Sequence, residues 1–406
     1  MPAKSAKTKS AIFRQVCEII PSHMVSKLAR KHDIKFRAIT PWSHTVSMLY
    51  AQFTHAIGLN DVCDALRANR SAMASIRGAE PPSRNGLSNA NKMRDPKMAQ
   101  DLFWSMLSHL EKLHPGFGGA KFRKIPRRFK RAVYAVDSST IKLFANCMDW
   151  ARHRRRKAAA KLHLRLDLQN FLPAFAIVDA AKGHDNTKAH ELCSGLKSGE
   201  IVVFDMAYID YKHLYLLNQR EVFWVCRVKD NMKLRCVKRL SKSPNGRILR
   251  DDLVVVAKSK KRKEYPERMR RITAVVEVNG KDVEMVFFSN NLEWAASSIC
   301  DLYKSRWSIE TFFKQIKQTL NLGAFLGHNK NAIQWQVWTA LLMYVLLRFL
   351  HACCDWEHSF TRLFTCLRSV LWQRRSILNY LKSYGTAGGH FKLLWSPQQA
   401  FLPGFS

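Results

Sequence analysis

The stretch that decides the fold is Ser298–Leu320, SICDLYKSRWSIETFFKQIKQTL. Its periodicity predicts one helix, because apolar and polar side chains separate onto two faces at about 100° per residue. The polar stripe of this helix consists of Tyr303, Arg306, Glu310 and Lys317. The apolar face that would dock on a core consists of Leu302, Ile309, Phe312, Phe313, Ile316 and Leu320. A carboxylate flanked by cations thus stands at the edge of a buried face, although an amphipathic surface helix with solvated charges would show the same pattern.

From residue 132 onward, the sequence pattern is typical of β-strands. Three strand-like runs with short links, AVYAVDSSTIKL at 132–143, KLHLRLDL at 161–168 and PAFAIVDA at 173–180, predict an antiparallel meander. A helix (187–196), a buried strand (200–206), a second helix (211–218) and a last strand (222–228) follow. Three antiparallel strands and then strands that alternate with helices is the order of an RNase H-like sheet, so we expect an α/β fold of that type.

Two aspartates lie in these predicted strands, Asp137 in the first and Asp205 at the end of the fourth. The first and fourth strands are neighbours in an RNase H-like sheet, and Glu310 would approach from the helix that covers them. Isolated carboxylates are costly to bury, whereas three together form a cage for hard divalent cations. We therefore expect two Mg²⁺ ions, with Mn²⁺ as a substitute, about 3.5 to 4 Å apart and poised for displacement at phosphorus. The other aspartates of this region are expected in turns, caps or solvent; they are Asp167, Asp179, Asp185 and Asp210.

The net charge is the outlying feature of the composition. The 406 residues include 67 Lys and Arg against 31 Asp and Glu, a formal charge of +36, and this excess points to nucleic acid or an anionic membrane. Membrane binding is the weaker interpretation, because the basic stretch at 1–10 is followed by no apolar segment and the run Val337–Leu350 is too short to span and contains Arg348. That run predicts a core helix.

The cysteines indicate neither a disulfide framework nor a zinc ribbon, because the ten of them include no CxxC pair and no regular spacing. A reducing cytoplasm suits this pattern. A zinc site at His351, Cys353, Cys354 and His358 is a weak alternative, since tetrahedral sites usually space their ligands more widely.

The expected domain organisation has four parts. They are a basic tail and helical, DNA-binding N-terminal domain at 1–97, a helix and basic linker at 98–131, the RNase H-like domain at 132–331 with a β-rich insertion at about 229–290, and C-terminal helices at 332–406. A plain helical bundle that supports the core is an equal alternative for the N-terminal part. The segment of about 70 residues before Ser298 contains several strand-like runs and is too long for a loop, so we expect an insertion there.

The spacing Tyr303, Arg306, Glu310, Lys317 resembles the Tyr-Arg-Glu-Lys signature of DDE transposases of the insertion-sequence-four family. VDSSTIKL around Asp137 and VFDMAYIDY around Asp205 are similar to the two aspartate blocks of that family, and the resemblance spans about 13–349. It implies that Asp137, Asp205 and Glu310 are catalytic metal ligands. It also implies that Tyr303, Arg306 and Lys317 contact phosphates near the transposon end, for which Arg and Lys are chemically suited.

The function expected from this resemblance is cut-and-paste transposition of a bacterial insertion sequence. The protein would bind the terminal inverted repeats, cut each 3′ end and join the freed 3′-hydroxyls to target DNA. Its partners would be double-stranded DNA and a second copy in a synaptic homodimer, in the bacterial cytoplasm at the nucleoid. The alternatives are a metal-dependent nuclease or resolvase of the same fold, which cuts without joining, and an inactive DNA-binding derivative. If the second strand is cut through a hairpin, Trp224, Trp294 and Trp307 are available to stack on a flipped base.

Overall fold

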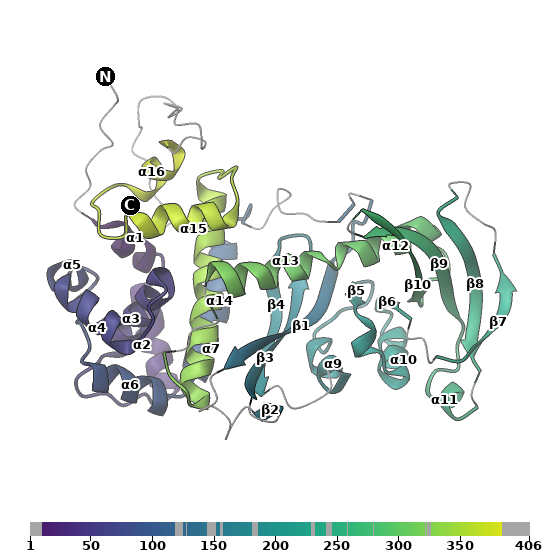
Figure 1. Ribbon diagram of the computed structural model, residues 1–406, viewed down its shortest axis with the longest axis horizontal. Coiled ribbons are helices and arrows are strands. Elements are labelled where there is room, and N and C mark those ends of the chain that lie inside the picture. Colours follow the sequence, from purple (N-terminus) through teal and green to yellow (C-terminus); the bar gives the residue numbers. More distant parts are fainter. Residues whose placement is uncertain are drawn as a thin grey trace. The chain divides into compact units, whose positions relative to one another are not determined.

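The computed structural model describes residues 10–117, 125–126, 128–143, 152–154, 157–180, 186–228, 232–240, 246–257, 259–278, 280–320, 322 and 326–383 (Figure 1). The chain divides into two compact units. The first comprises Met1–Gly118, Ile141–Ala159 and Lys314–Ser406, and the second comprises Gly119–Thr140 and Ala160–Phe313. Residues 118–124 and 127 of the predicted basic linker lie outside the described residues, and so do Asp185 and the end of the chain beyond residue 383.

The first unit consists mainly of helices from both ends of the chain. Its elements are α1 (Ile12–Glu18), α2 (Ser22–Lys31), α3 (Pro41–Thr54), α4 (Leu59–Ala68), α5 (Arg70–Ala74), α6 (Arg84–Met93), α7 (Lys97–Leu113), the π-helical turn η4 (Gln315–Thr319), α14 (Lys330–Cys353), α15 (Phe360–Ser369) and α16 (Ile377–Ser383). Helix α14 packs against α3, α6, α7 and α15. The N-terminal and C-terminal helices therefore share one core, which their separation in the sequence does not indicate.

Helix α14 is the core helix predicted around Val337–Leu350. By length and composition it could cross a membrane, but 83% of its most apolar window is buried inside the protein. The indole of Trp335 donates a hydrogen bond to the Arg94 carbonyl, and Thr339 Oγ1 donates to the Trp335 carbonyl. The apolar surface of α14 is accounted for by packing against the neighbouring helices.

Residues 78–97 are rich in Pro, Gly, Asn and Ser, a composition typical of loops, yet α6 forms within them. Its N-cap is Ser83, whose Oγ accepts from the Gly86 amide at 3.1 Å. Leu87 and Ala90, one turn apart, are buried. Capping and burial of this narrow apolar stripe outweigh the low helix propensity of the Gly, Asn and Ser residues around it.

The second unit is built on a mixed sheet to which ten strands belong. The strands are β1 (Val133–Leu143), β2 (Arg152–Arg154), β3 (Lys157–Asp167), β4 (Leu172–Ala180), β5 (Ile201–Phe204), β6 (Phe223–Arg227), β7 (Leu234–Arg239), β8 (Ile248–Val256), β9 (Met269–Val278) and β10 (Lys281–Ser289). Their order is β2-β3-β1-β5-β6-β10-β9-β8-β7, with β4 also paired to β3. Strand β2 and the adjoining ends of β1 and β3 are assigned to the first unit.

The sheet order confirms the RNase H-like fold predicted from the sequence. Strands β3 and β4 are antiparallel, β1 pairs with β5 in parallel, and β5 pairs with β6 in parallel. Helices α9 (Asn186–Leu192) and α10 (Tyr211–Gln219) provide the crossovers that parallel neighbours require. Figure 1 shows α9 and α10 on one side of these strands and α12 (Ala296–Ser305) and α13 (Ser308–Lys314) on the other.

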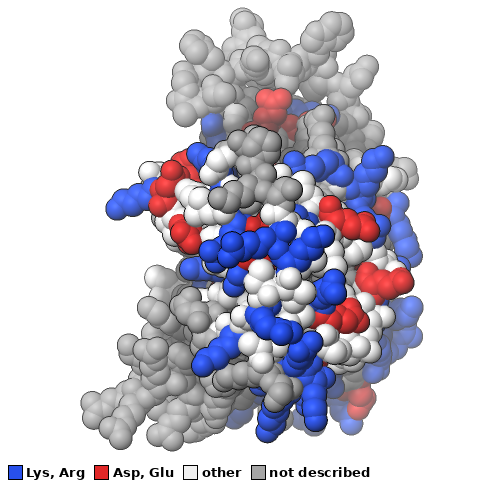
Figure 2. All heavy atoms as spheres, turned by 90° about the vertical axis from the view of Figure 1, so that its right-hand side faces the viewer, with Lys and Arg blue, Asp and Glu red and all other residues white. Residues whose placement is uncertain are grey.

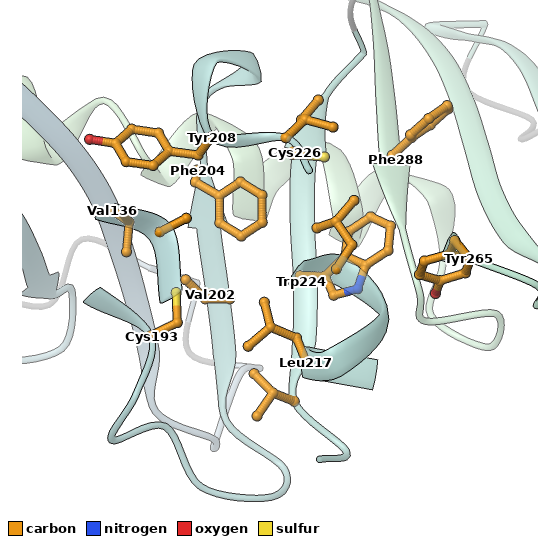
Figure 3. Close-up of a cluster of buried hydrophobic side chains, with 14 of the residues drawn as sticks. Val136, Cys193, Val202, Phe204, Tyr208, Leu217, Trp224, Cys226, Tyr265 and Phe288 are labelled. Atoms are coloured by element: carbon orange, nitrogen blue, oxygen red, sulfur yellow. The ribbon is translucent and has the colours of Figure 1, made fainter. Parts of the chain in front are cut away.

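The core on the α9 and α10 side is continuous from the central strands to the insertion (Figure 3). Phe204 on β5 and Trp224 on β6 are almost fully buried there, and Phe288 on β10 and Tyr265 belong to the same cluster. The rings of Trp224 and Tyr265 meet edge to face, with centroids 6.1 Å apart. Aromatic packing of this kind joins the two parts of the sheet.

The β-rich segment between β6 and α12 extends the sheet. Strand β10 pairs antiparallel with β6, and β9, β8 and β7 follow outward by antiparallel pairing. The short helix α11 (Ser259–Glu264) lies between β8 and β9. Strand β7 was not predicted, and almost all its side chains are exposed, so it has no apolar face to mark it.

A buried ion pair ties this segment to the approach to α12. Arg270 on β9 donates from Nε and Nη2 to the Asp251 carboxylate on β8, at 2.9 and 2.6 Å. Its Nη1 donates to the carbonyls of Leu292 and Trp294, which precede α12. Only 7% of the Arg270 side chain and 4% of the Asp251 side chain are exposed.

Replacing one partner of this pair should destabilise the protein strongly. We expect Asp251→Ala to lower the free energy of unfolding by about 3 to 5 kcal/mol, because it leaves the Arg270 charge buried without its counter-ion. Urea denaturation followed by tryptophan fluorescence measures the change. The control is Lys261→Ala, which removes an ion pair with Glu264 whose lysine is 49% exposed, and it should cost at most about 1 kcal/mol. Equal effects of the two variants would contradict this assignment.

Candidate active site

The pairing of β1 with β5 places two aspartates side by side. The parallel register aligns Val133 with Ile201 and continues to the pair Val136 and Phe204. Asp137 is the next residue of β1, and Asp205 directly follows the end of β5, so both carboxylates lie where this pairing ends. This neighbourhood was expected from the strand order alone.

Local backbone contacts orient both aspartates. Asp137 Oδ1 accepts from the Ser138 amide at 2.7 Å, and Asp205 Oδ1 accepts from the Met206 amide at 2.8 Å. Asp205 is the N-cap of a 3₁₀ turn, Met206–Tyr208. Such charge-assisted bonds fix one oxygen of each carboxylate and leave the other for further partners.

The stretch 298–320, predicted as one helix, is divided by a turn. Helix α12 ends at Ser305, α13 runs from Ser308 to Lys314, and the π-helical turn η4 follows. Across the junction, the Arg306 amide donates to the Tyr303 carbonyl and the Ile309 amide donates to the Arg306 carbonyl, each at 3.0 Å. These bonds span three residues, so Arg306 lies in a tight turn between the two helices.

Arg306 forms a bridge between two of the predicted carboxylates. Its Nη1 donates to Asp137 Oδ2 at 2.9 Å, and its Nη2 donates to Glu310 Oε1 at 3.1 Å. The Arg306 side chain is 7% exposed and that of Asp137 20%, whereas that of Glu310 is 58% exposed. The guanidinium therefore lies between a mostly buried carboxylate and one that faces solvent.

Tyr303 completes the cluster. Its hydroxyl donates to Asp205 Oδ1 at 3.4 Å, and the Arg306 guanidinium carbon lies 5.5 Å from the centroid of its ring. The structure thus brings together Asp137, Asp205, Tyr303, Arg306 and Glu310, all in the second unit. Tyr303 and Arg306 were expected to bind phosphate, but in this structure they contact the carboxylates. The sequence pattern that indicated their proximity to Glu310 is the polar stripe that the three residues share.

The electrostatics follow from burial and crowding. Burial raises the pKa of Asp137 to about 6, against the opposing effects of Arg306 and the Ser138 amide and with a further contribution from the charges of Asp205 and Glu310. Burial also raises the pKa of Tyr303 to about 12, so its hydroxyl remains a donor. For Arg306, burial alone would lower the pKa, but Tyr303 and the three carboxylates outweigh it and raise the pKa.

The remaining residues named from the sequence lie elsewhere. Lys317 is half-buried in η4 and belongs to the first unit, so it is not among the residues gathered in the second. Trp224 is almost fully buried, which leaves no face on which a base could stack. Trp294 packs against Phe129 and Phe223, while Trp307 is partly exposed.

The described aspartates that compete with Asp137 and Asp205 have structural partners. Asp167 Oδ1 accepts from the Gln169 amide at 2.7 Å in the turn after β3. Asp210 Oδ1 accepts from the His213 amide at 3.0 Å as the N-cap of α10. Asp179 pairs with Lys188 at 3.4 Å. These contacts are the turn, cap and solvent roles expected from the sequence.

The carboxylate cluster has the donor chemistry of a divalent-cation site. Arg306 contacts two of the three carboxylates, Asp137 and Glu310, so the cluster has three carboxylates and one guanidinium. Oxygen ligands of this type suit Mg²⁺ and Mn²⁺. Within the described part of the chain, however, no group of three His, Cys, Asp or Glu side chains is arranged closely enough to hold a metal ion, and the Glu310 carboxylate contacts Arg306.

Comparison with known proteins gives matches over most of the chain. A family model described as the transposase DDE domain matches residues 128–346, and another, described as a domain of unknown function, matches residues 8–76. The probable transposase for insertion sequence element IS5377 of Geobacillus stearothermophilus is 29% identical over 225 residues, 55% of this chain and 58% of that protein. Transposase InsG for insertion sequence element IS4 of Escherichia coli is 22% identical over 198 residues, 47% of this chain and 43% of that protein. The chain thus spans little more than half the length of the first of these relatives.

Among solved structures, the piggyBac transposase synaptic complex with hairpin DNA overlaps 93% of this chain and 82% of that chain. The sequence identity is 9% and the TM-score is 0.43.

The raised pKa of Asp137 makes stability depend on pH. An ordinary aspartate has a pKa near 3.9, whereas the pKa of Asp137 in the folded protein is about 6. The protonated carboxyl is therefore favoured by folding, so its contribution to stability is complete below about pH 4 and is lost as the pH rises through about 6. Asp137→Asn mimics the protonated form at every pH. With a chelator present, we expect the variant to gain up to about 3 kcal/mol of unfolding free energy over the wild type between about pH 4 and pH 7.

Urea denaturation at a series of pH values measures this difference, and Asp282→Asn on the exposed end of β10 is the control. A difference between wild type and Asp137→Asn that does not change with pH would show that the folded environment leaves this carboxyl as acidic as in the unfolded chain.

Proposed function

The chain belongs to the family of transposases with a DDE domain, whose model covers more than half of it, and on this premise we propose that it mobilises a bacterial insertion sequence of the insertion-sequence-four type. It binds the terminal inverted repeats, cleaves the phosphodiester at each 3′ end and joins the freed 3′-hydroxyl to target DNA. The observation that carries this proposal is the cluster of Asp137, Asp205 and Glu310 at one site of an RNase H-like sheet.

In this proposal Asp137, Asp205 and Glu310 would hold two divalent cations, whose chemistry when bound would be to activate a water or 3′-hydroxyl and to stabilise the leaving oxygen. The fold fixes the positions of these carboxylates. Strand pairing fixes Asp137 and Asp205 relative to each other, and the amides of Ser138 and Met206 hold one oxygen of each. Glu310 comes from a helix with an exposed side chain, so it is the ligand free to adjust.

Tyr303 and Arg306 are positioning residues for these carboxylates in the absence of DNA. The Tyr303 hydroxyl holds Asp205, and Arg306 bridges Asp137 and Glu310. When DNA is bound, Arg306 and Lys317 serve as cationic ligands of phosphates near the transposon end, because a guanidinium binds phosphate through two parallel donors and an ammonium binds it as a point charge.

The basic surface would supply the sequence-independent part of DNA affinity. Figure 2 shows Lys and Arg side chains gathered on the face of the molecule at the insertion end of the sheet. Exposed cations on this part of the chain include Arg235, Lys238 and Arg239 on β7 and Lys261, Arg262 and Lys263 on α11. Phosphate contacts of this kind position the duplex and make binding salt-dependent. We further propose that two copies act together, because both ends of an element must be cut in concert.

The proposal is tested by the joining of DNA ends. Purified protein is incubated with Mg²⁺, a linear DNA that carries the terminal repeats of the element, and a supercoiled target. We expect joined products from the wild type and a loss of at least about 10³-fold in Asp205→Asn, since removal of a metal ligand takes away charge stabilisation in the transition state. Asp210→Asn is the matched control, because asparagine also caps a helix and α10 is preserved.

Each outcome of this assay separates the candidate functions. Cleavage without joining would replace the transposase by a nuclease or resolvase. DNA binding alone, equal in wild type and Asp205→Asn, would leave only a DNA-binding derivative.

The assignment of Lys317 is tested by salt. Lys317→Ala should weaken binding of the terminal duplex and reduce the slope of log affinity against log salt by about one, as expected for the loss of one phosphate contact. Fluorescence anisotropy at several salt concentrations measures the slope, and Lys382→Ala, which removes an exposed lysine from α16, is the comparison. An unchanged slope in Lys317→Ala would remove this lysine from the DNA contacts.

A further inference from the structure

Arg306 is bonded to oxygens that a divalent cation would also need. Its two terminal nitrogens donate to Asp137 Oδ2 and to Glu310 Oε1, and the side chain is almost fully buried between them. A guanidinium and a divalent cation that share these oxygens would repel each other across a few ångströms of low dielectric. Full occupation of the site by cations and the present position of Arg306 are therefore in competition.

We propose that Arg306 is the resting counter-ion of the site and that it is exchanged for divalent cations, so that cation binding releases its guanidinium to a DNA phosphate. This inference rests on the proposed function, since it takes the carboxylates as cation ligands and DNA as the partner. It adds that the two binding events are coupled, and that one residue carries the coupling.

Charge explains why the exchange occurs in this order. Without a cation, departure of Arg306 would leave Asp137 mostly buried beside Asp205 and Glu310 with no positive charge, which is strongly unfavourable. A divalent cation removes that penalty. The guanidinium then has no favourable place among the carboxylates, and a phosphate diester offers the bidentate acceptor that it lost.

The local structure allows Arg306 to move. It lies in the turn between α12 and α13 and not inside a regular helix, and its Glu310 partner is more than half exposed. Among the described residues its Nε has no hydrogen-bond partner, so Arg306 is held by its two terminal nitrogens.

A fixed role for Arg306 makes the opposite prediction. If Arg306 only orients Asp137 and Glu310 for the cations, its removal disorders the ligands and weakens cation binding. If it competes with the cations, its removal strengthens their binding. The sign of the change therefore distinguishes competition from orientation, independently of catalytic activity.

The experiment measures Mn²⁺ binding to the full chain by the electron paramagnetic resonance of free Mn²⁺, without DNA. We expect Arg306→Gln to bind Mn²⁺ more tightly than the wild type, by a factor within the range of about 5 to 150 that is typical of coupled sites. Lys304→Gln removes an exposed cation two residues away on α12 and controls for the change in net charge. Arg306→Lys, which keeps the charge but cannot bridge two carboxylates, should be intermediate and serves if the glutamine variant does not fold.

A second measurement adds a duplex with the terminal repeat. In the wild type, Mn²⁺ should tighten DNA binding and DNA should tighten Mn²⁺ binding by the same factor, as linkage requires. In Arg306→Gln this mutual effect should disappear, and in Lys304→Gln it should persist. Fluorescence anisotropy with and without Mn²⁺ gives the DNA affinities.

The possible failures can be told apart. Equal or weaker Mn²⁺ binding in Arg306→Gln, with binding still abolished by Asp137→Asn, would overturn the exchange and leave the proposed function intact. Mn²⁺ binding that is unaffected by Asp137→Asn and Asp205→Asn would overturn the cation site itself, and with it both proposals.

Discussion

The parallel pairing of β1 with β5 is the constraint on which the rest of the site depends. It places Asp137 and Asp205 side by side, and the burial of Asp137 removes much of the hydration of its carboxylate. Two like charges in such a place require compensation. The turn between α12 and α13 provides it through Arg306, whose guanidinium reaches Asp137 while Tyr303 reaches Asp205. The position of α12 and α13 over the sheet therefore depends on the ionic contacts of Arg306 as well as on their apolar side chains.

Sequence patterns predicted the features that depend on short repeats. Alternation in 132–143 and 161–168 predicts strands, and the order of strands and helices predicts that Asp137 lies beside Asp205, as the structure confirms. The partner of Arg306 could not be predicted in the same way. An arginine on a polar stripe suits a phosphate and a carboxylate equally well, and only the three-dimensional position of β1 under the turn decides between them.

The other differences between expectation and structure have a common physical origin. Helix α6 contains Gly, Asn and Ser, so its local propensity is poor, but its cap and the burial of Leu87 stabilise it. Strand β7 exposes nearly all its side chains and has no periodicity to detect. The pairing of α14 with α3 and α7 joins segments more than two hundred residues apart, which no local pattern encodes. Tertiary contacts override local signals in each case.

The antiparallel pairing of β10 with β6 also limits how this protein could have changed during its history. In a five-stranded sheet β6 would be the last strand, with a row of unsatisfied amides and carbonyls along its outer side. Here the β-rich segment covers that side, and Trp224 of β6 packs against Tyr265 from the same segment. A deletion of this segment would leave β6 as an exposed edge strand, which could pair with a strand of another molecule. The β-rich segment thus protects the outer edge of β6 from pairing with another molecule. A related protein without this segment would have to cover β6 in another way.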